Sequence, residues 1–372
     1  MNKRLITLIT HEYLPDRGGA GVYCEELASA ANKAGHEIEV WAPRGSIQND
    51  SFKVRHMPHK GSQDWTCSWS LLKFIKNHRP FPDLVHLGDP GVLRAFIRFH
   101  WALKTCPTLV ITIHGSELLK FTRNQLEKFL FLSLLKKTSR IHVLSKHNEQ
   151  VLISIFPEIF KKIVRIPGAA ARRVLPLDDC LNEEVSKSPD TEISLICVGR
   201  IHPRKGQLEL INAIAGLSQK SKNKLKCYFA GPIIKQTYFK KLQEAASKSC
   251  CIVEFLGDLT DEELKNKYET ADIFALTSIP QPKSVEGFGF VYLEASAHGI
   301  PILAHRTGGV EDAVKDEETG FLVDSGNHSG LIEKLEILIN DERLREFMGR
   351  KGRKWAMKHT WSQVSKELYE KL

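Results

Sequence analysis

The 372-residue sequence contains no stretch that approaches the roughly 20 consecutive apolar residues needed to cross a bilayer. Its first apolar run follows a basic start and ends at His11-Glu12, so it is too short for a secretion signal and is typical of a buried strand. The eight cysteines are scattered, and the adjacent pair Cys250-Cys251 lacks metal-ligand spacing. We therefore expect reduced thiols and a cytoplasmic location.

Complete sets of metal ligands and nucleic-acid recognition motifs are also missing. His56 and His59 lie in a polar stretch at residues 43–70, where we find no carboxylate or cysteine that completes a set. The sequence therefore predicts no metal site, and this stretch is predicted to be an irregular, variable loop followed by a helix over residues 70–78. Nothing in the chain matches a nucleic-acid-binding motif.

Positive charge is concentrated in the first half of the chain. Residues 1–180 hold 26 Lys and Arg against 16 Asp and Glu, whereas the remainder holds 27 against 28. Ordinary solvated surface explains such an excess, and so does attraction to an anionic lipid surface or an anionic ligand. Both interpretations stay open at this point.

Strands, glycine-containing loops and helices alternate along the chain, which is typical of doubly wound parallel sheets. The first repeat of the pattern is a strand at 5–10, a loop that carries Gly18 and Gly19, and a helix over 22–34. The pattern restarts at a strand over 193–198, after a segment of linker composition. We therefore predict an α/β protein with an N-terminal domain at 1–173, a linker at 174–191 and a C-terminal domain at 192–357.

The most informative stretch runs over residues 284–310. Glu286 precedes a glycine-punctuated turn, Gly287-Phe288-Gly289, and Glu294 follows it. The turn is predicted to open a helix whose first backbone N–H groups are available to an anion, with Glu294 one to two turns inside. One carboxylate before such a turn and one behind it suit a ligand that is anionic in the middle and hydroxylated at both ends.

Two further segments place polar residues at strand ends. A strand over 109–113 delivers His114, followed by Gly115, at its carboxyl end, where open α/β sheets hold ligand groups. Arg200 and Lys205 similarly follow the strand at 193–198, between two glycines. Two cations at this position suit an anionic ligand.

These segments together resemble one family. The run E-G-F-G-F-V-Y-L-E-A-S-A-H-G-I-P-I-L-A that starts at Glu286 closely resembles the donor-binding segment of the retaining glycosyltransferases of family four, the group 1 enzymes of the GT-B superfamily. The segment G-R-x-x-x-x-K-G at 199–206, the His-Gly pair at 114–115 and the glycine pair at 18–19 match the same family. The resemblance implies two Rossmann-like domains facing across a cleft, with the last helix, 358–372, packed back on the N-terminal domain.

The resemblance also implies roles for individual residues. Arg200 and Lys205 are expected to hold a diphosphate, and Glu294 to bind the ribose. Glu286 and His114 are expected to contact the transferred sugar, which makes them the catalytic candidates. The remaining expected donor-binding residues act through their backbones or close packing: Gly18, Gly19, Gly257, Gly287, Phe288, Gly289 and Phe290.

The implied function is a hexosyltransferase that moves a hexose from a UDP- or GDP-sugar to an acceptor hydroxyl with retention, in polysaccharide, lipopolysaccharide or glycolipid synthesis. Because the chain has no D-x-D motif, we expect no metal and no cofactor besides the nucleotide-sugar substrate. The expected partners are that donor, a saccharide or lipid-linked acceptor and an anionic membrane touched peripherally by the basic domain, without nucleic acid. The inner face of the cytoplasmic membrane is thus an alternative location.

Two other classes of protein remain open from the sequence. A nonhydrolysing sugar-nucleotide epimerase has the same double fold, but it is expected to lack this combination of basic loop and paired glutamates. A non-catalytic basic protein that binds membranes or nucleic acid is expected to lack some of the donor-binding residues.

Overall fold

The computed structural model describes residues 5–15, 18–78, 82–103, 108–176, 192–282 and 284–370. The chain forms two compact units, each described below by itself. Unit 1 holds Met1–Gly168, Pro282–Phe288 and Thr360–Leu372, and unit 2 holds Ala169–Gln281 and Gly289–His359. The linker expected at 174–191 lies, from residue 177 onward, outside the described residues.

Unit 1 is built on a seven-stranded sheet in which every pairing is parallel, in the order β3-β2-β1-β4-β5-β6-β7. Its strands are β1 (Leu5–Ile9), β2 (Glu37–Ala42), β3 (Lys53–His56), β4 (Leu84–Leu87), β5 (Thr108–Ile113), β6 (Arg140–Val143) and β7 (Ile163–Arg165). Its main helices are α1 (Gly19–Lys33), α2 (Trp65–Asn77), α3 (Pro90–Phe99), α4 (Ser116–Phe121), α5 (Gln125–Lys137), α6 (Lys146–Ile155) and α15 (Trp361–Tyr369). Short 3₁₀ turns are η1 (His100–Ala102) and η2 (Pro157–Lys162).

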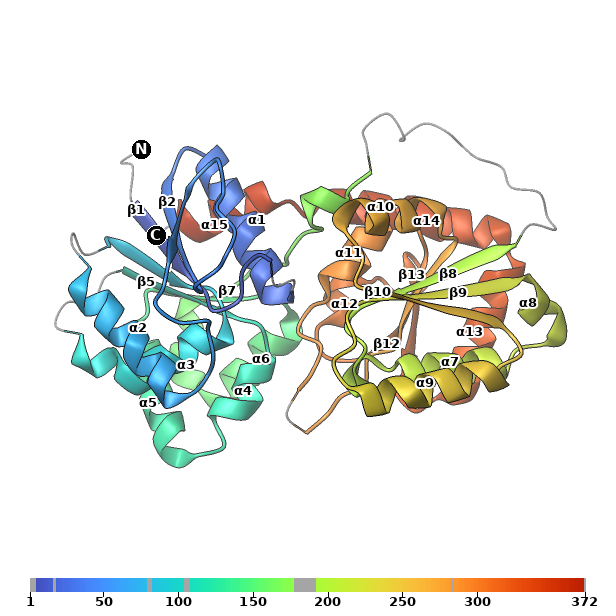
Figure 1. Ribbon diagram of the computed structural model, residues 1–372, viewed down its shortest axis with the longest axis horizontal. Helices are drawn as coiled ribbons and strands as arrows, with labels where there is room; N and C mark the ends of the chain where they lie inside the picture. The colour runs from blue at the N-terminus through green and yellow to red at the C-terminus, as the bar shows by residue number, and fades with distance from the viewer. Residues whose placement is uncertain are drawn as a thin grey trace. The chain divides into compact units, whose positions relative to one another are not determined.

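Unit 2 repeats this plan with a six-stranded parallel sheet in the order β10-β9-β8-β11-β12-β13. Its strands are β8 (Ile193–Val198), β9 (Leu225–Ala230), β10 (Ile252–Gly257), β11 (Ile273–Leu276), β12 (Ile302–Arg306) and β13 (Gly320–Asp324). Its helices are α7 (Gln207–Ala215), α8 (Gln219–Lys224), α9 (Gln236–Lys248), α10 (Asp261–Thr270), α11 (Phe290–Ala297), α12 (Val310–Ala313), α13 (His328–Asn340) and α14 (Glu342–Met357). Its 3₁₀ turns include η3 (Arg172–Val174) and η5 (Pro203–Lys205) (Figure 1).

The predicted α/β class with two Rossmann-like sheets is confirmed, and each sheet reverses its strand order once. The reversal lies between β1 and β4 in unit 1 and between β8 and β11 in unit 2. Because all strands in a sheet are parallel, their following loops gather at one edge, and ligands of such sheets bind at the reversal. The loops after β1, β4, β8 and β11 are therefore the first places to look for a site.

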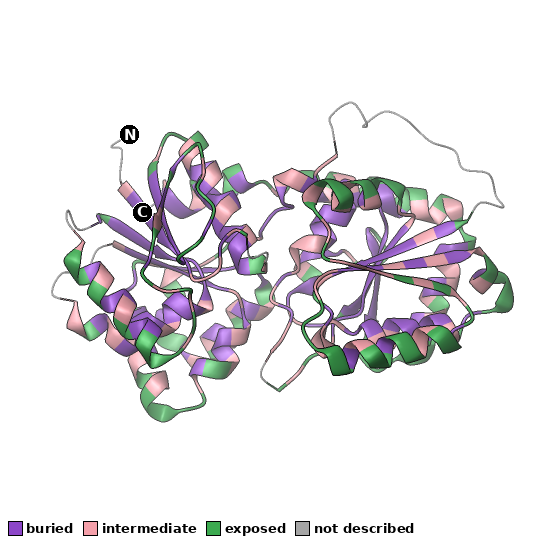
Figure 2. Ribbon diagram, viewed as in Figure 1, coloured by how far each residue is buried: buried purple, intermediate pink, exposed green. Residues whose placement is uncertain are grey.

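Both sheets consist of apolar strands that are buried because amphipathic helices cover them. Figure 2 shows strands that are mostly buried and helices that expose one face to solvent. All four residues of β4 and of β11 are buried, for example, which is typical of central parallel strands. Among the described residues, no helix is both long and apolar enough to span a membrane.

Two predicted boundaries in unit 1 were wrong. Helix α1 begins at Gly19, three residues before the expected start, with Gly18 as its N-cap. Helix α2 begins at Trp65, where an irregular loop was expected, because the Asp64 carboxylate accepts a hydrogen bond from the Cys67 amide and caps the helix. Strand β3 also lies inside the stretch expected to be irregular.

The C-terminal helix α15 is fixed to unit 1 by a buried polar network. The hydroxyl of Tyr369 lies 2.7 Å from Nδ1 of His86, whose Nε2 lies 2.7 Å from Oγ1 of Thr112. Oγ1 of Thr112 also lies 2.8 Å from the Tyr23 hydroxyl and 3.1 Å from Nδ1 of His142. These groups join α1, β4, β5, β6 and α15, so the end of the chain is part of the structure of unit 1.

Candidate functional site

The loop after β8 presents cations at the carboxyl edge of the unit 2 sheet. Arg200 is exposed and Lys205 is half-buried, at the end of η5. The Gln207 side chain donates to the Arg200 carbonyl oxygen over 2.9 Å, which fixes the loop against the start of α7. His202 caps η5 by accepting a hydrogen bond from the Arg204 amide.

The electrostatics of this loop are positive. Burial lowers the pKa of His202, and nearby Lys235, Arg204, Arg200 and Lys205 lower it further. Four cations around one imidazole leave a region that attracts anions. No ion pair involves Arg200 among the described residues, so a bound diphosphate is a suitable counter-charge.

Gly206 allows this loop to pack directly on the strand at the reversal. Its φ is +68°, and a Cβ placed there would lie 1.8 Å from the carbonyl oxygen of Thr277, the residue after β11. The Thr277 hydroxyl donates to the Gly206 carbonyl oxygen over 2.8 Å. The loops after β8 and β11 are thereby locked together at the point where the sheet order reverses.

Helix α11 begins as the sequence predicted, at Phe290 after the glycine turn. Its N-cap is Gly289, which has φ +87° and ψ +77°. The hydroxyl of Tyr292 donates to the Leu276 carbonyl oxygen over 3.1 Å and holds the first turn of α11 to β11. The N-terminus of α11 therefore lies near the reversal, where its backbone N–H groups favour an anion.

Glu294 lies on α11 and is only 6% exposed. The hydroxyl of Tyr268, on α10, donates to Oε2 of Glu294 over 3.0 Å. Burial and the neighbouring Glu294 raise the pKa of Tyr268, so this hydroxyl stays a neutral donor. The sequence did not indicate Tyr268, because the pair is formed by two helices that are separate in the chain.

The other expected residues of unit 2 also lie at this edge. Gly257 ends β10 with φ +70°, and its carbonyl oxygen accepts a 2.7 Å hydrogen bond from the Gly231 amide after β9. Unit 2 thus gathers cations, a helix N-terminus and a fixed carboxylate along one edge of its sheet.

In unit 1, His114 directly follows β5 and has a defined orientation. Its Nε2 donates to the Gly88 carbonyl oxygen over 2.8 Å, which fixes the orientation of the ring. The Tyr23 ring lies edge-on to the imidazole, with ring centroids 5.3 Å apart. His114 therefore adjoins the buried polar network that holds α15.

The segment that carries Glu286 belongs to unit 1 and packs beside His114. A Cβ at Gly287 would lie 1.7 Å from the His114 carbonyl oxygen, so only glycine fits this approach. The Asn148 side chain donates to the Gly287 carbonyl oxygen over 3.4 Å, and Ser116 and Ser284 hydroxyls lie 3.0 Å apart. Glu286 itself is buried, at 8% exposure. The structure therefore brings the two catalytic candidates into one neighbourhood.

Asn148 is a polar residue of this neighbourhood that sequence reasoning missed. It is fully buried on α6, and its Oδ1 has no hydrogen-bond partner among the described residues. Ser145 caps α6 by accepting from the Asn148 amide, which marks the start of the helix but gives no signal for the contact made by the Asn148 side chain.

The glycine pair of unit 1 opens α1. Gly18 is the N-cap, and Gly19 is the first helical residue. A Cβ at Gly18 would overlap the carboxylate of Glu12, which a flexible side chain can move to avoid. Both glycines follow β1 and so lie at the same edge as His114. Phe288 is buried and is the last residue of its segment of unit 1.

The two doubly wound sheets, with polar and glycine-containing loops at their carboxyl edges, define a protein of GT-B architecture. Comparison with family models agrees. Residues 181–355 match the model described as glycosyl transferases group 1, and residues 17–170 match glycosyltransferase family 4. The chain belongs to this family of glycosyltransferases.

Curated relatives span nearly the whole chain. A D-inositol 3-phosphate glycosyltransferase from Corynebacterium jeikeium is 34% identical over 391 residues, with 96% of this chain and 91% of the relative covered. A GDP-mannose-dependent alpha-(1-6)-phosphatidylinositol monomannoside mannosyltransferase from Mycolicibacterium smegmatis is 27% identical, covering 94% of this chain and 93% of the relative.

Solved structures share the fold. Sucrose-phosphate synthase from Thermosynechococcus elongatus superposes with a TM-score of 0.79 at 19% identity and covers 99% of this chain and 98% of that one. The Anabaena protein HepE, solved in complex with UDP and glucose, has a TM-score of 0.76 at 18% identity and covers 99% of both chains.

Proposed function

We propose that this chain is a retaining hexosyltransferase that moves a hexose from a UDP- or GDP-sugar to an acceptor hydroxyl. The observation that carries the proposal is the combination along one edge of unit 2. Buried Glu294 is fixed by Tyr268, and the loop of Arg200 and Lys205 follows β8 at the same edge. A carboxylate suits the paired hydroxyls of a ribose, and cations suit a diphosphate.

In this proposal the leaving diphosphate is neutralised by side chains and backbone amides instead of a metal. Arg200 and Lys205 carry positive charge, and the N-terminus of α11 adds the partial charge of its backbone amides. Groups that are already oriented toward developing charge stabilise a transition state without reorganisation. The expected reaction therefore needs no cofactor beyond its nucleotide-sugar.

The proposed chemistry takes place on one face of the sugar. The bond between the anomeric carbon and the diphosphate oxygen breaks, the acceptor oxygen bonds to that carbon from the same side, and its proton moves to the departing phosphate oxygen. His114 and Glu286 contribute polar groups to the transferred hexose. A covalent glycosyl intermediate trapped on Glu286 would contradict this route.

The acceptor is proposed to be an anionic saccharide or lipid-linked saccharide of envelope synthesis. Two relatives carry names that refer to inositol phosphate and to phosphatidylinositol mannoside, which support this chemical class and favour GDP-mannose as one donor to test. The excess of positive charge in residues 1–180 would attract such an anionic acceptor.

An exposed aromatic surface on α2 and α3 supports peripheral contact with a membrane. Trp65 and Trp69 are 64% and 49% exposed, and both rings pack edge-on against Phe99. The ammonium of Lys73 lies 5.7 Å from the Trp69 ring centroid. Tryptophan beside basic residues is typical of the membrane interface. A small apolar hollow adjoins this surface, lined by Ser68, Leu71, Leu72, Ile75, Ala95, Phe96, Phe99, His100 and Leu103.

Membrane contact is tested by sedimentation with vesicles of phosphatidylcholine, with and without phosphatidylglycerol. We expect binding that requires the anionic lipid and weakens in a Trp65→Ser/Trp69→Ser double variant. Ile252→Ser, at an equally exposed residue of unit 2, is the matched control and should bind like the wild type. Equal sedimentation of the double variant would contradict a role for this surface.

The transfer itself is tested with GDP-mannose or a UDP-hexose and an inositol phosphate or phosphatidylinositol acceptor. Nuclear magnetic resonance of the product should show the anomeric configuration of the donor. An inverted product would contradict retention. An isomerised sugar nucleotide formed without acceptor would instead indicate an epimerase.

A further inference from the structure

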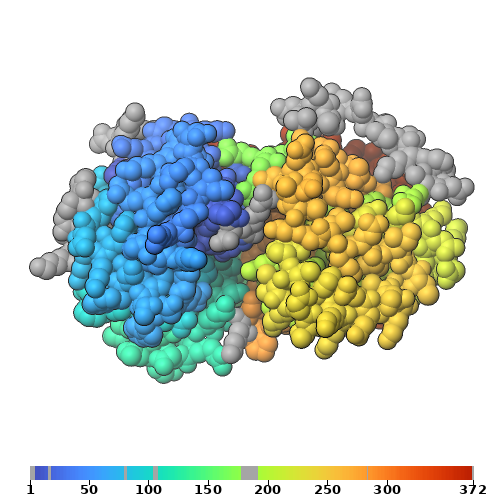
Figure 3. All heavy atoms as spheres, in the orientation of Figure 1, coloured from blue at the N-terminus to red at the C-terminus, as the bar shows by residue number. Residues whose placement is uncertain are grey.

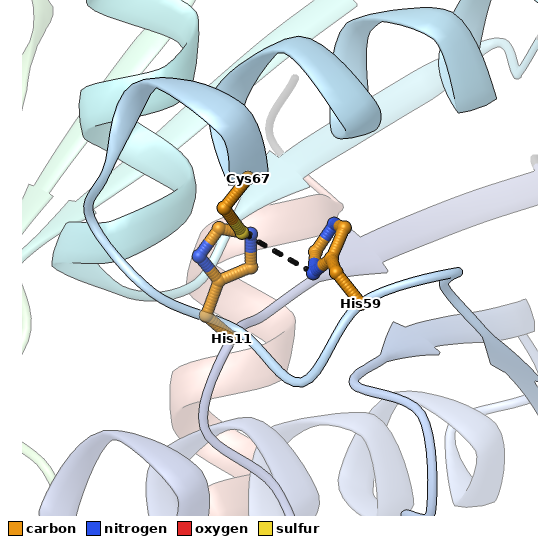
Figure 4. Close-up of side chains that lie close together, drawn as sticks. All are labelled: His11, His59 and Cys67. Carbon is orange, nitrogen blue, oxygen red and sulfur yellow. Dashed lines mark hydrogen bonds between the residues drawn. The ribbon is translucent and has the colours of Figure 1, made fainter.

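Three side chains from separate segments of unit 1 converge beside the strand reversal. His11 lies in the loop after β1, His59 follows β3, and Cys67 lies in the first turn of α2 (Figure 4). One potential ligand atom from each of the three lies within 4.8 Å of the others. Figure 3 shows the neighbouring segment from β2 to α2, in mid-blue, forming much of the visible surface of unit 1. The proposed function uses none of these three residues.

The distances suit a single metal ion. Sγ of Cys67 lies 3.3 Å from Nδ1 of His59 and 4.0 Å from Nε2 of His11. Ligand atoms bound to one tetrahedral zinc at about 2.0–2.3 Å are separated from one another by about 3.3–3.8 Å. An ion therefore fits between these atoms with small side-chain adjustments.

In each imidazole one nitrogen lies near the thiol and is the candidate ligand: Nε2 of His11 and Nδ1 of His59. The other nitrogens, Nδ1 of His11 and Nε2 of His59, are buried without a hydrogen-bond partner among the described residues. The Gly61 amide donates to Nδ1 of His59 over 3.3 Å, so that nitrogen is the unprotonated one. Binding of a metal by Nδ1 would replace this long hydrogen bond, and the ion would lie beside the thiol sulfur 3.3 Å from that nitrogen.

The surrounding residues hold the three ligands in place. Oδ1 of Asp64 accepts from the Cys67 amide over 2.7 Å, and Asp89 accepts from the His11 amide. The imidazoles of His11 and His59 meet edge-on, with centroids 5.0 Å apart. Asp89 therefore holds the backbone of His11 in place, while Nδ1 of the His11 imidazole has no hydrogen-bond partner among the described residues.

We infer that His11, His59 and Cys67 form a binding site for a divalent cation of the zinc class. Two imidazole nitrogens and one thiolate are borderline and soft ligands, which favour zinc over magnesium or calcium. Three protein ligands leave a fourth position for water or an external ligand. The bound ion joins the loop after β1 to the β3–α2 segment, and its ligands are not among the proposed donor-binding residues.

The site is tested on the full chain by metal analysis and by titration of the metal-free protein with Zn²⁺ and Co²⁺. We expect one Zn²⁺ per chain, a rise in unfolding temperature on adding Zn²⁺, and a thiolate-to-cobalt charge-transfer band with Co²⁺. Cys67→Ser should remove the band, and His59→Ala should weaken Zn²⁺ binding at least about 10-fold.

Matched controls are His56→Ala, in the same segment, and Cys250→Ser, an exposed thiol of unit 2. Both should bind Zn²⁺ like the wild type. Circular dichroism and an unfolding temperature measured without metal establish that Cys67→Ser is folded. A wild type that binds no Zn²⁺, or a folded Cys67→Ser that binds it equally well, would overturn the inference. Bound zinc would also make the sequence prediction of no metal site wrong.

Discussion

At the scale of single residues, the hydrogen bond from Tyr268 to Glu294 is the main structural support for the proposed donor site of unit 2. Tyr268→Phe removes the donor at 3.0 Å but keeps the ring. A hydrogen bond to a charged group contributes about 1.5–3 kcal/mol, so we expect nucleotide-sugar binding to weaken about 10-fold or more, because the carboxylate loses its fixed position. Isothermal titration calorimetry measures this. Tyr228→Phe, on β9, is the control and should leave the affinity unchanged.

His142 makes a second prediction, about pH. Burial lowers the pKa of His142 to about 4, while Nε2 donates to the Ile166 carbonyl oxygen. The His142 imidazole is therefore protonated near pH 6.5 in the unfolded chain, but only near pH 4 in the folded chain. The neutral imidazole makes its full contribution to the free energy of unfolding above pH 6.5. This contribution decreases as the pH falls, and about 3 kcal/mol of it is lost at pH 4.

This loss is measured by urea unfolding of the wild type and His142→Gln between pH 7.5 and 4. The variant should be less stable at pH 7.5 and should lose less stability on acidification. Buried His86, whose pKa is also lowered by burial, contributes in the same direction in both proteins. If the free energy of unfolding changed equally with pH in the two proteins, the lowered pKa assigned to His142 would be wrong.

At the scale of elements, the approach of the Glu286 segment to β5 depends on Gly287. Gly287→Ala places a methyl group whose carbon would lie 1.7 Å from the His114 carbonyl oxygen. The segment must move, so we expect transfer activity to fall by at least about 10-fold, since displacement of positioning groups strongly slows catalysis. Unfolding temperature should change little because the segment is short. Wild-type activity in the folded variant would show that transfer does not depend on the position of the Glu286 segment.

Helices α11 and α14 allow a matched comparison of two glycines on one helix. A Cβ at Gly349 would lie 2.0 Å from the Gly299 carbonyl oxygen, whereas at Gly352 the nearest atom, Oγ of Ser296, is 3.4 Å away. Gly349→Ala should therefore destabilise the protein by about 1–3 kcal/mol. Gly352→Ala should be near neutral, since alanine favours helix by up to about 1 kcal/mol. Urea unfolding of both variants tests this order.

The sequence predicted elements where one local signal was strong. Buried strands followed by glycine loops were recognised, and so was the start of α11 after Gly289. The start of α2 was missed because Trp65 and Trp69 are exposed and give a weak apolar pattern, although Asp64 is a good N-cap. Local signals define elements, and caps decide where they begin.

Contacts between distant segments were beyond sequence reasoning. Cys67 and His11 are 56 positions apart, and Asn148 and Gly287 are 139 positions apart. No local pattern links such pairs, because the order of strands in the sheet brings them together. The individual candidates were therefore predictable where a family motif marked them, whereas their supporting partners were not.

At the scale of the whole molecule, the chain passes repeatedly between its two units. Glu286 belongs to unit 1 and Glu294 to unit 2, although the sequence treats them as one stretch. The crossing lies between Phe288 and Gly289, inside the predicted donor-binding segment. Residues from both units therefore share one continuous motif. We predict that substitution of site residues in either unit reduces transfer, and that substitution of the proposed diphosphate- and ribose-binding residues of unit 2 also weakens donor binding.

The most direct measurement of the central claim is donor binding by a panel of UDP-, GDP- and ADP-sugars, with and without EDTA. Wild type, Glu294→Ala, Lys205→Ala and the control Lys220→Ala, whose exposed side chain lies on α8, would be compared by calorimetry. We predict that one UDP- or GDP-sugar binds equally well with and without EDTA, and that its binding is lost in Glu294→Ala and Lys205→Ala but not in Lys220→Ala. Binding that requires a metal, or that survives both substitutions, would contradict this prediction.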